Sequence, residues 1–130
     1  MDSALNQAFE AILTQAKVVQ ADFPVMRGPL QSGAGIALEP DPSGPTMRHM
    51  DGGIILTLDI VMNGKATDRR ALTNALHLLH SVLTRKGPLP QGRGWQITHI
   101  DTQTFPALVE RQKDGQWLYA SSLTATIYIN

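Results

Sequence analysis

The sequence contains no cysteine among its 130 residues. Disulfide bonds, thiolate metal ligands and cysteine nucleophiles are therefore excluded. An excess of charge is also missing, because 11 Lys and Arg residues balance 11 Asp and Glu residues. Proteins that hold nucleic acid by neutralising many phosphates need a basic excess, so we predict no specific nucleic-acid binding.

Long apolar runs are absent as well. The most apolar segment, Ile54–Met62, contains Thr57 and Asp59 and is far shorter than the roughly 20 residues that cross a bilayer. The first residues, Met1-Asp2-Ser3, lack the basic region of an export signal. We therefore expect a soluble protein that stays in the compartment where it is made and does not bind membranes.

The composition that remains is typical of a globular protein. Hydrophobic residues make up 42% of the chain and charged residues 17%, a balance that supports a core rather than disorder. The length fits one domain, so we predict a single domain over residues 1–130.

Two segments show the spacing of amphipathic helices. Apolar side chains recur at intervals of three and four in residues 3–20 and again in residues 68–86, which places them on one stripe of each helix. The second helix is followed by Gly87-Pro88, a pair that commonly ends helices. Each stripe needs a flat surface to cover.

The other regular segments alternate between apolar and polar residues, as half-buried strands do. The predicted strands, in chain order, are 36–39, 46–63, 95–99, 107–111 and 116–129. We expect Gly52-Gly53 to bend the long second strand, Thr102–Pro106 to form a turn or kink, and Asp114-Gly115 to close a hairpin. Together the elements predict an α+β fold: a mainly antiparallel sheet of four to five strands with two helices packed on one face.

The residues that carry chemistry form no convincing catalytic or metal-binding pattern. His77 and His80 stand three positions apart on the second helix, but no His-Glu-x-x-His or Gly-x-Ser-x-Gly motif accompanies them. We interpret both histidines as boundary or surface residues, and Asp59 as a solvated residue on the outer face of its strand. The sequence thus predicts no catalytic, cofactor-binding or metal-binding residues, and no enzyme.

The outer face of the long strand points instead to contact with another chain. Ile55 and Val61 lie on that face, and the first helix carries few charges for a solvated element. Apolar groups on surfaces with few charges favour self-association. We therefore expect part of this surface to be covered by another subunit.

Several strings, in order along the chain, resemble one protein family. They are Gly35-Ile36-Ala37-Leu38-Glu39-Pro40, the loop Pro42-Ser43-Gly44-Pro45, Arg48 with Asp51-Gly52-Gly53, the helix from Asp68, Trp117-Leu118-Tyr119 and Thr126-Ile127-Tyr128-Ile129. In order and spacing the chain resembles the phage minor capsid proteins that act as tail terminators. The resemblance spans nearly the whole chain.

The resemblance implies a structural role at the head-proximal end of a phage tail. Proteins of this kind form rings, typically six-fold, that stop polymerisation of the tail tube and join the tail to the head connector. It implies as partners other copies of the chain, the tail tube protein and the head connector protein, and as location the neck of a virion assembled in the host cytoplasm. No cofactor is implied.

A ring is built from heterologous contacts, in which one patch meets a different patch of the next copy. We expect the ring interface to include the proline-rich loop and the two apolar residues of the long strand: Pro40, Asp41, Pro42, Ser43, Gly44, Pro45, Ile55 and Val61. The loop is stiff, so it loses little conformational freedom on contact.

Two other interpretations stay open. The chain is also compatible with another head–tail neck component, which the residues do not distinguish from a tail terminator. A small α+β ligand-binding or metal-binding protein would require polar residues that converge on the core faces. Leu, Ile, Val and Ala occupy those positions instead, which favours packing over a pocket.

Overall fold

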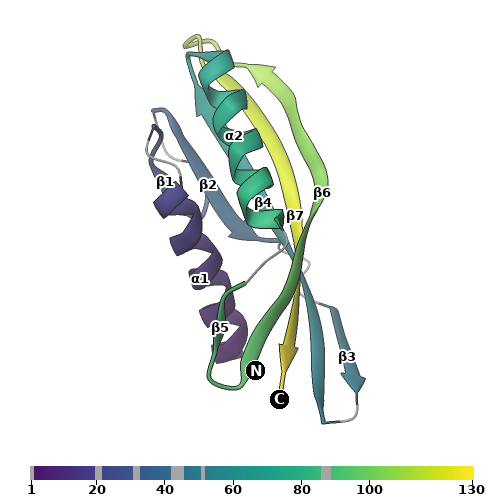
Figure 1. The fold of residues 1–130 in the computed structure, drawn as a ribbon. Helices are drawn as coiled ribbons and strands as arrows, with labels where there is room; N and C mark the ends of the chain where they lie inside the picture. Colours follow the sequence, from purple (N-terminus) through teal and green to yellow (C-terminus); the bar gives the residue numbers. More distant parts are fainter. Residues whose placement is uncertain (1, 20–21, 31–32, 42–45, 51, 86–88) are drawn as a thin grey trace.

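The computed structural model describes residues 2–19, 22–30, 33–41, 46–50, 52–85 and 89–130. Within these ranges the chain forms two helices, the first followed by four strands and the second by three (Figure 1). Their order is α1 (Asp2–Val19), β1 (Val25–Arg27), β2 (Gly35–Pro40), β3 (Thr46–Met50), β4 (Gly53–Ala66), α2 (Arg69–Thr84), β5 (Gln91–Gly92), β6 (Trp95–Arg111) and β7 (Trp117–Ile129).

The strands form one sheet in the order β1-β2-β4-β7-β6-β5, with β3 paired to β4. The expected α+β class is confirmed, but the expected sheet of four to five strands is too small. The sheet has seven strands and is mixed, because β1 pairs with β2 in parallel while the other pairs are antiparallel. The short strands β1 and β5 lie at the two edges. With three and two residues, they are too short to show an alternation of apolar and polar residues in the sequence.

The segment 46–63 was expected to be one strand with a bend at Gly52-Gly53, and this prediction is wrong. It is a hairpin: β3 folds back on β4, with Thr46 opposite Thr57 and His49 opposite Ile54. Gly52 has a φ of 81°, a left-handed conformation that glycine adopts without steric cost. The reversal shortens the strand and creates a new outer strand, β3.

The segment Thr102–Pro106 was expected to be a turn or kink; it is not a turn, but the strand is irregular there. It lies inside β6, which runs without interruption from Trp95 to Arg111. The pairing with β7 shifts register between Thr102 and Thr104 and again between Thr104 and Ala107. These β-bulges accommodate Pro106, whose missing N–H a regular central strand could not tolerate. The predicted hairpin around Asp114-Gly115 joins β6 to β7 as expected.

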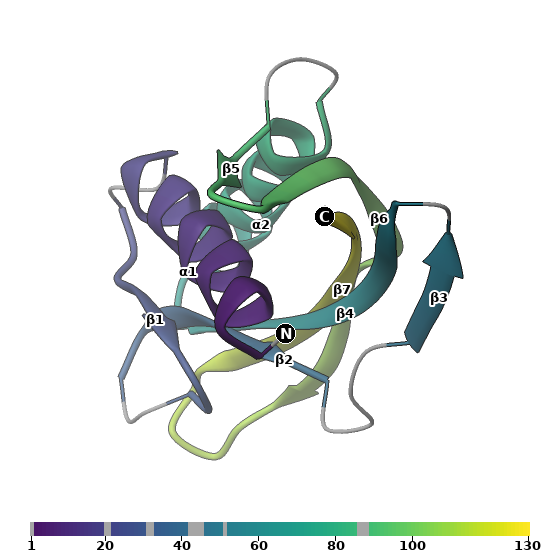
Figure 2. The ribbon, with the colours of Figure 1, turned by 90° about the horizontal axis from the view of Figure 1, so that it is seen from below.

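Both helices lie on one side of the curled sheet, which leaves its other face without a helix (Figure 2). The buried side chains of both helices and of the inner sheet face form one cluster. The alternation of β4 places Leu56, Leu58, Ile60 and Met62 in this core, each at most 1% exposed. The predicted core faces of β4 and β7 are thus confirmed.

Helix α2 begins at a cap and packs closely on β4. The Asp68 side chain accepts a hydrogen bond from the N–H of Ala71 at 3.1 Å, which satisfies a free donor of the first turn. At Gly64 of β4, a Cβ would stand 2.8 Å from Leu72 Cδ1 of the helix. The glycine therefore lets α2 approach the sheet. Neither described helix is long and apolar enough to cross a membrane.

Candidate interaction surfaces

The sheet face away from the helices is rich in hydroxyl groups. Thr57, Asp59 and Val61 of β4 stand opposite Thr126, Thr124 and Ser122 of β7. Thr124 Oγ1 donates to Asp59 Oδ1 at 2.9 Å, so Asp59 lies on the outer face as predicted but is half-buried and hydrogen-bonded. We call this surface the outer face. Its polar character differs sharply from the apolar inner face.

The two apolar residues singled out from the sequence both lie on the outer face. Ile55 is half-buried between Arg48 of β3 and Tyr128 of β7. Val61 is half-buried between Glu39 of β2 and Ser122 of β7. They stand six positions apart on one strand, or about 20 Å at the usual rise. They therefore share a face without forming one patch.

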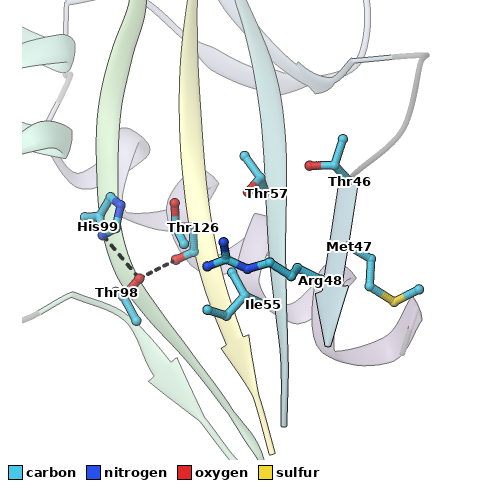
Figure 3. Close-up of a pocket in the computed structure, with 8 residues that line it drawn as sticks. All are labelled: Thr46, Met47, Arg48, Ile55, Thr57, Thr98, His99 and Thr126. Carbon is cyan, nitrogen blue, oxygen red and sulfur yellow. Dashed lines mark hydrogen bonds between the residues drawn. The ribbon is translucent and has the colours of Figure 1, made fainter. Parts of the chain in front are cut away.

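A groove of about 480 Å³ crosses the outer face near Ile55 (Figure 3). Its lining comes from four strands and combines threonine hydroxyls with two basic side chains: Thr46, Met47, Arg48, Ile55, Thr57, Thr98, His99 and Thr126. Arg48 extends from β3 across Ile55 toward β7 (Figure 3). Thr98 Oγ1 donates to the carbonyl of Thr126 at 3.2 Å. Sequence reasoning found Ile55 but missed the rest, because four strands far apart in the chain supply it.

The proline-rich loop is described only at its start. Pro40 ends β2 opposite Ile60, and the N–H of Asp41 donates to the carbonyl of Asp59 at 2.8 Å. Both residues are half-buried. The other predicted interface residues of the loop, Pro42, Ser43, Gly44 and Pro45, lie outside the described residues.

A long stretch of β6 has a strand partner on one side alone. Its inner neighbour is β7, while its outer neighbour β5 pairs with Trp95 and Gln96 and goes no further. From Asp101 to Arg111, every residue except Thr102 and Pro106 is exposed. We call residues 101–110 the free edge of β6, since no described strand pairs with their outer side. An open edge offers unpaired N–H and C=O groups to another strand.

The free edge also carries exposed apolar side chains. Phe105, Leu108 and Val109 are 69%, 43% and 57% exposed. The other large apolar side chains that are exposed in the described chain are spread over α1, β3 and α2: Val18, Met47 and Leu78. The sequence placed residues 102–106 in a turn, so this concentration on one strand edge was missed.

The prediction that His80 is a boundary or surface residue is wrong. Its side chain is buried, with 3% exposed, whereas His77 is exposed as expected. The imidazole lies between the helix and the sheet, where Nδ1 is 2.9 Å from Thr102 Oγ1 and Nε2 is 2.9 Å from Ser121 Oγ. It joins α2 to strands β6 and β7.

The hydrogen bonds around His80 assign its tautomer. Ser121 Oγ donates to the carbonyl of Met62 at 3.1 Å, so it accepts from Nε2–H of the imidazole. Nδ1 is then the acceptor for the Thr102 hydroxyl. Burial, and secondarily the charge of His77, lowers the pKa of His80 from 6.5 to about 4. Both ring nitrogens are engaged within the fold, which makes His80 a structural residue.

No cluster of three or more His, Asp or Glu side chains within the described ranges could hold a metal ion. His77 and His80 diverge, because one is exposed and the other is bonded to Thr102 and Ser121. The geometry therefore directs attention to surfaces, namely the outer face and the free edge of β6.

The comparisons with known proteins bear on the fold. No protein-family model matches the chain, and no curated protein matches it. Among solved structures, a chain of the virion of a native gene transfer agent particle superposes with a TM-score of 0.73. The fold is shared with a virion chain. The match covers 96% of this protein and 98% of that chain at 16% sequence identity, and at this identity it establishes the fold alone.

Proposed function

We propose that the protein is a structural component of a phage-type virion, and specifically a tail terminator. The observation that carries the proposal is the shared fold with a virion chain across nearly the full length of both proteins. A match that covers both chains end to end compares whole subunits, not an isolated motif. The resemblance in the sequence points the same way and supplies the finer role.

In this role the protein forms a ring at the head-proximal end of the tail. The ring stops growth of the tail tube and presents a surface to the head connector. Its partners are other copies of the chain, the tail tube protein and the head connector protein, and its place is the tail neck of a virion assembled in the host cytoplasm. No enzymatic step belongs to it.

The surfaces support a building block of this kind. The free edge of β6 exposes Phe105, Leu108 and Val109, and apolar groups beside unpaired backbone are typical of contacts between chains. The described core between helices and sheet is apolar apart from a few polar groups, such as the hydrogen-bonded pair His80 and Ser121. The rigid two-layer block thus leaves its outer surfaces available to neighbours.

Deletion of the gene from the phage or prophage that encodes it tests the role. We expect electron micrographs to show tails of uncontrolled length and heads without tails. Wild-type protein supplied in trans should restore normal particles, and so should the Leu78→Ser variant, which changes an exposed side chain of α2 away from the free edge.

The other outcomes separate the alternatives. Tails of normal length beside unattached heads would replace the tail terminator with another neck component. Normal infectious particles in the absence of the gene would contradict a virion role altogether.

A further inference from the structure

We propose that copies of this chain join edge to edge, with the free edge of β6 in one copy pairing with strand β3 of the next. This inference rests on the proposed function, since it names the contact that builds the ring. The sheet of one subunit then continues into the sheet of its neighbour. Backbone hydrogen bonds provide the affinity, and exposed side chains on both strands select the partner.

The free edge of β6 is only partly protected against pairing with another strand. Soluble proteins protect edges with short strands, lysines and other charged groups, prolines, bulges or covering elements. Residues 101–110 contain no lysine, and they carry Phe105, Leu108 and Val109 as exposed apolar groups. Pro106 and the bulges around it limit where a ladder can form. They leave the stretch 107–111, in which every residue is exposed and the pairing with β7 shifts register once, between Leu108 and Glu110.

Strand β3 is the matching edge on the opposite side of the sheet. It pairs with β4 on one side, and no described element pairs with its other side. It has five residues, as does the stretch 107–111, and the side chains of Thr46–His49 are exposed. Met47, 48% exposed, supplies an apolar contact for the β6 edge.

The other terminal strand on that side, β1, is a poorer candidate. It has three residues, and its last residue is held by helix α1. The Arg27 guanidinium pairs with Glu10 and lies 4.9 Å from the centre of the Phe9 ring. Because a side chain of β1 already contacts α1, this strand leaves fewer groups free to contact a neighbouring copy than β3 does.

Charge selects the same pair of edges. The charged side chains of the free edge are Asp101 and Glu110, both acidic, whereas β3 carries Arg48 and His49. The base that follows the free edge, Arg111, has its guanidinium 5.1 Å from the centre of the Trp117 ring of its own chain. No salt bridge occupies Arg48 among the described residues. Pairing β6 with β3 brings opposite charges together, while pairing β6 with β6 brings acid against acid.

Symmetry also separates the two arrangements. A β6–β6 contact is isologous and closes at two copies, whereas a β6–β3 contact is head-to-tail and closes as a ring when the rotation between copies completes a full turn. In the strand order the two edges lie on opposite sides of the β4–β7 pair, so each copy can use both at once. The β6–β3 contact therefore suits a ring.

The absence of cysteine allows a direct test by disulfide cross-linking. Met47→Cys is combined in turn with Gln103→Cys, Phe105→Cys, Ala107→Cys and Val109→Cys, and each purified protein is mildly oxidised. Disulfides require Cα atoms within about 7 Å of each other, so they report strand pairing. Circular dichroism and thermal melting check that each variant is folded, and native mass spectrometry of the wild type reports assembly independently.

We expect at least one double variant to give a ladder of covalent multimers on non-reducing gels. Each single variant should stay monomeric under denaturing conditions, and a mixture of the two matching single variants should give dimers and nothing larger. The control pair Met47→Cys with Leu78→Cys, which places the second thiol on α2, should give no ladder.

The failures are distinguishable. A single β6 variant that cross-links to itself would show an isologous contact and overturn the β6–β3 pairing. A ring in native mass spectra without any cross-link would overturn the pairing and leave the tail-terminator role standing. A wild-type protein that stays monomeric without cross-links would overturn the pairing and count against the ring itself.

Discussion

His80 is the polar side chain at which helix α2 meets strands β6 and β7. Its hydrogen bonds to Thr102 and Ser121 use both ring nitrogens, and Ser121 in turn donates a hydrogen bond to the carbonyl of Met62. A satisfied buried network of this kind fixes the position of a helix on a sheet more uniquely than apolar contacts do. It also gives the stability of the fold a dependence on pH.

Stability should fall when the pH is lowered from 6.5 toward 4. The unfolded chain binds a proton on this imidazole below a pKa of about 6.5, whereas the folded chain binds it below about 4. The stabilisation from neutral His80 is therefore complete above pH 6.5 and is lost as the pH falls through this window. We expect a decrease in the free energy of unfolding of up to about 1.4 kcal/mol per pH unit.

Urea denaturation of the wild type and of His80→Leu at pH 7.0 and pH 4.5 measures this dependence. The variant should be less stable than the wild type at pH 7.0, because Thr102 and Ser121 lose their partner. Its free energy of unfolding should also decrease less than that of the wild type between the two pH values. The His49→Leu variant, which changes an exposed imidazole of β3, serves as the control. Equal losses in wild type and His80→Leu would contradict the assignment.

At this scale the sequence carries limited information. The apolar stripe correctly predicted an exposed His77, but the helical pattern alone put His80 at the flank. Its partners Thr102 and Ser121 lie 22 and 41 residues further along the chain, and nothing local links them to it. Buried polar pairs of this kind depend on register between distant elements.

Among the elements, helix α2 depends on a close approach to β4. Replacing Gly64 with Ala should lower the free energy of unfolding by about 1–3 kcal/mol, the usual cost of overpacking a core. The new Cβ would meet Leu72 at 2.8 Å and Leu76 at 3.2 Å. Thermal melting of the variant and of the wild type measures this loss. A Gly64→Ala protein as stable as the wild type would show that the helix shifts freely.

The free edge of β6 should control assembly without controlling the fold. Val109→Asp replaces a 57% exposed apolar side chain and adds a third acid to an edge that already carries two. We expect the variant to keep its melting temperature within a few degrees and to lose self-association in sedimentation experiments. Val18→Asp, on exposed α1, is the matched control and should assemble normally. Loss of assembly in both variants would remove the special role of β6.

The elements also show where alternation of apolar and polar residues stops being informative. Residues 54–62 alternate clearly, and the core face of β4 was predicted correctly. Thr102–Pro106 combines a proline with polar residues, which favours a turn in isolation, yet β7 holds it in a strand through irregular pairing. Strands β1 and β5 are too short for any periodicity.

At the scale of the whole molecule, both helices cover one face of the sheet and the other face stays open (Figure 2). The sequence predicted this α+β layering because two one-sided helical stripes need a common flat partner. It underestimated the sheet, since the third edge strand arises from the reversal at Gly52 and the parallel strand β1 from a glycine-rich connection. The resulting sheet has two open edges on opposite sides, strand β3 and the free edge of β6.

The assembly of this chain into a ring is tested by native mass spectrometry of the wild-type protein over a wide concentration range, alone and with purified tail tubes. We expect a closed ring of one defined copy number, which forms at high concentration or on the tube end. A protein that remains a monomer under every one of these conditions would contradict it.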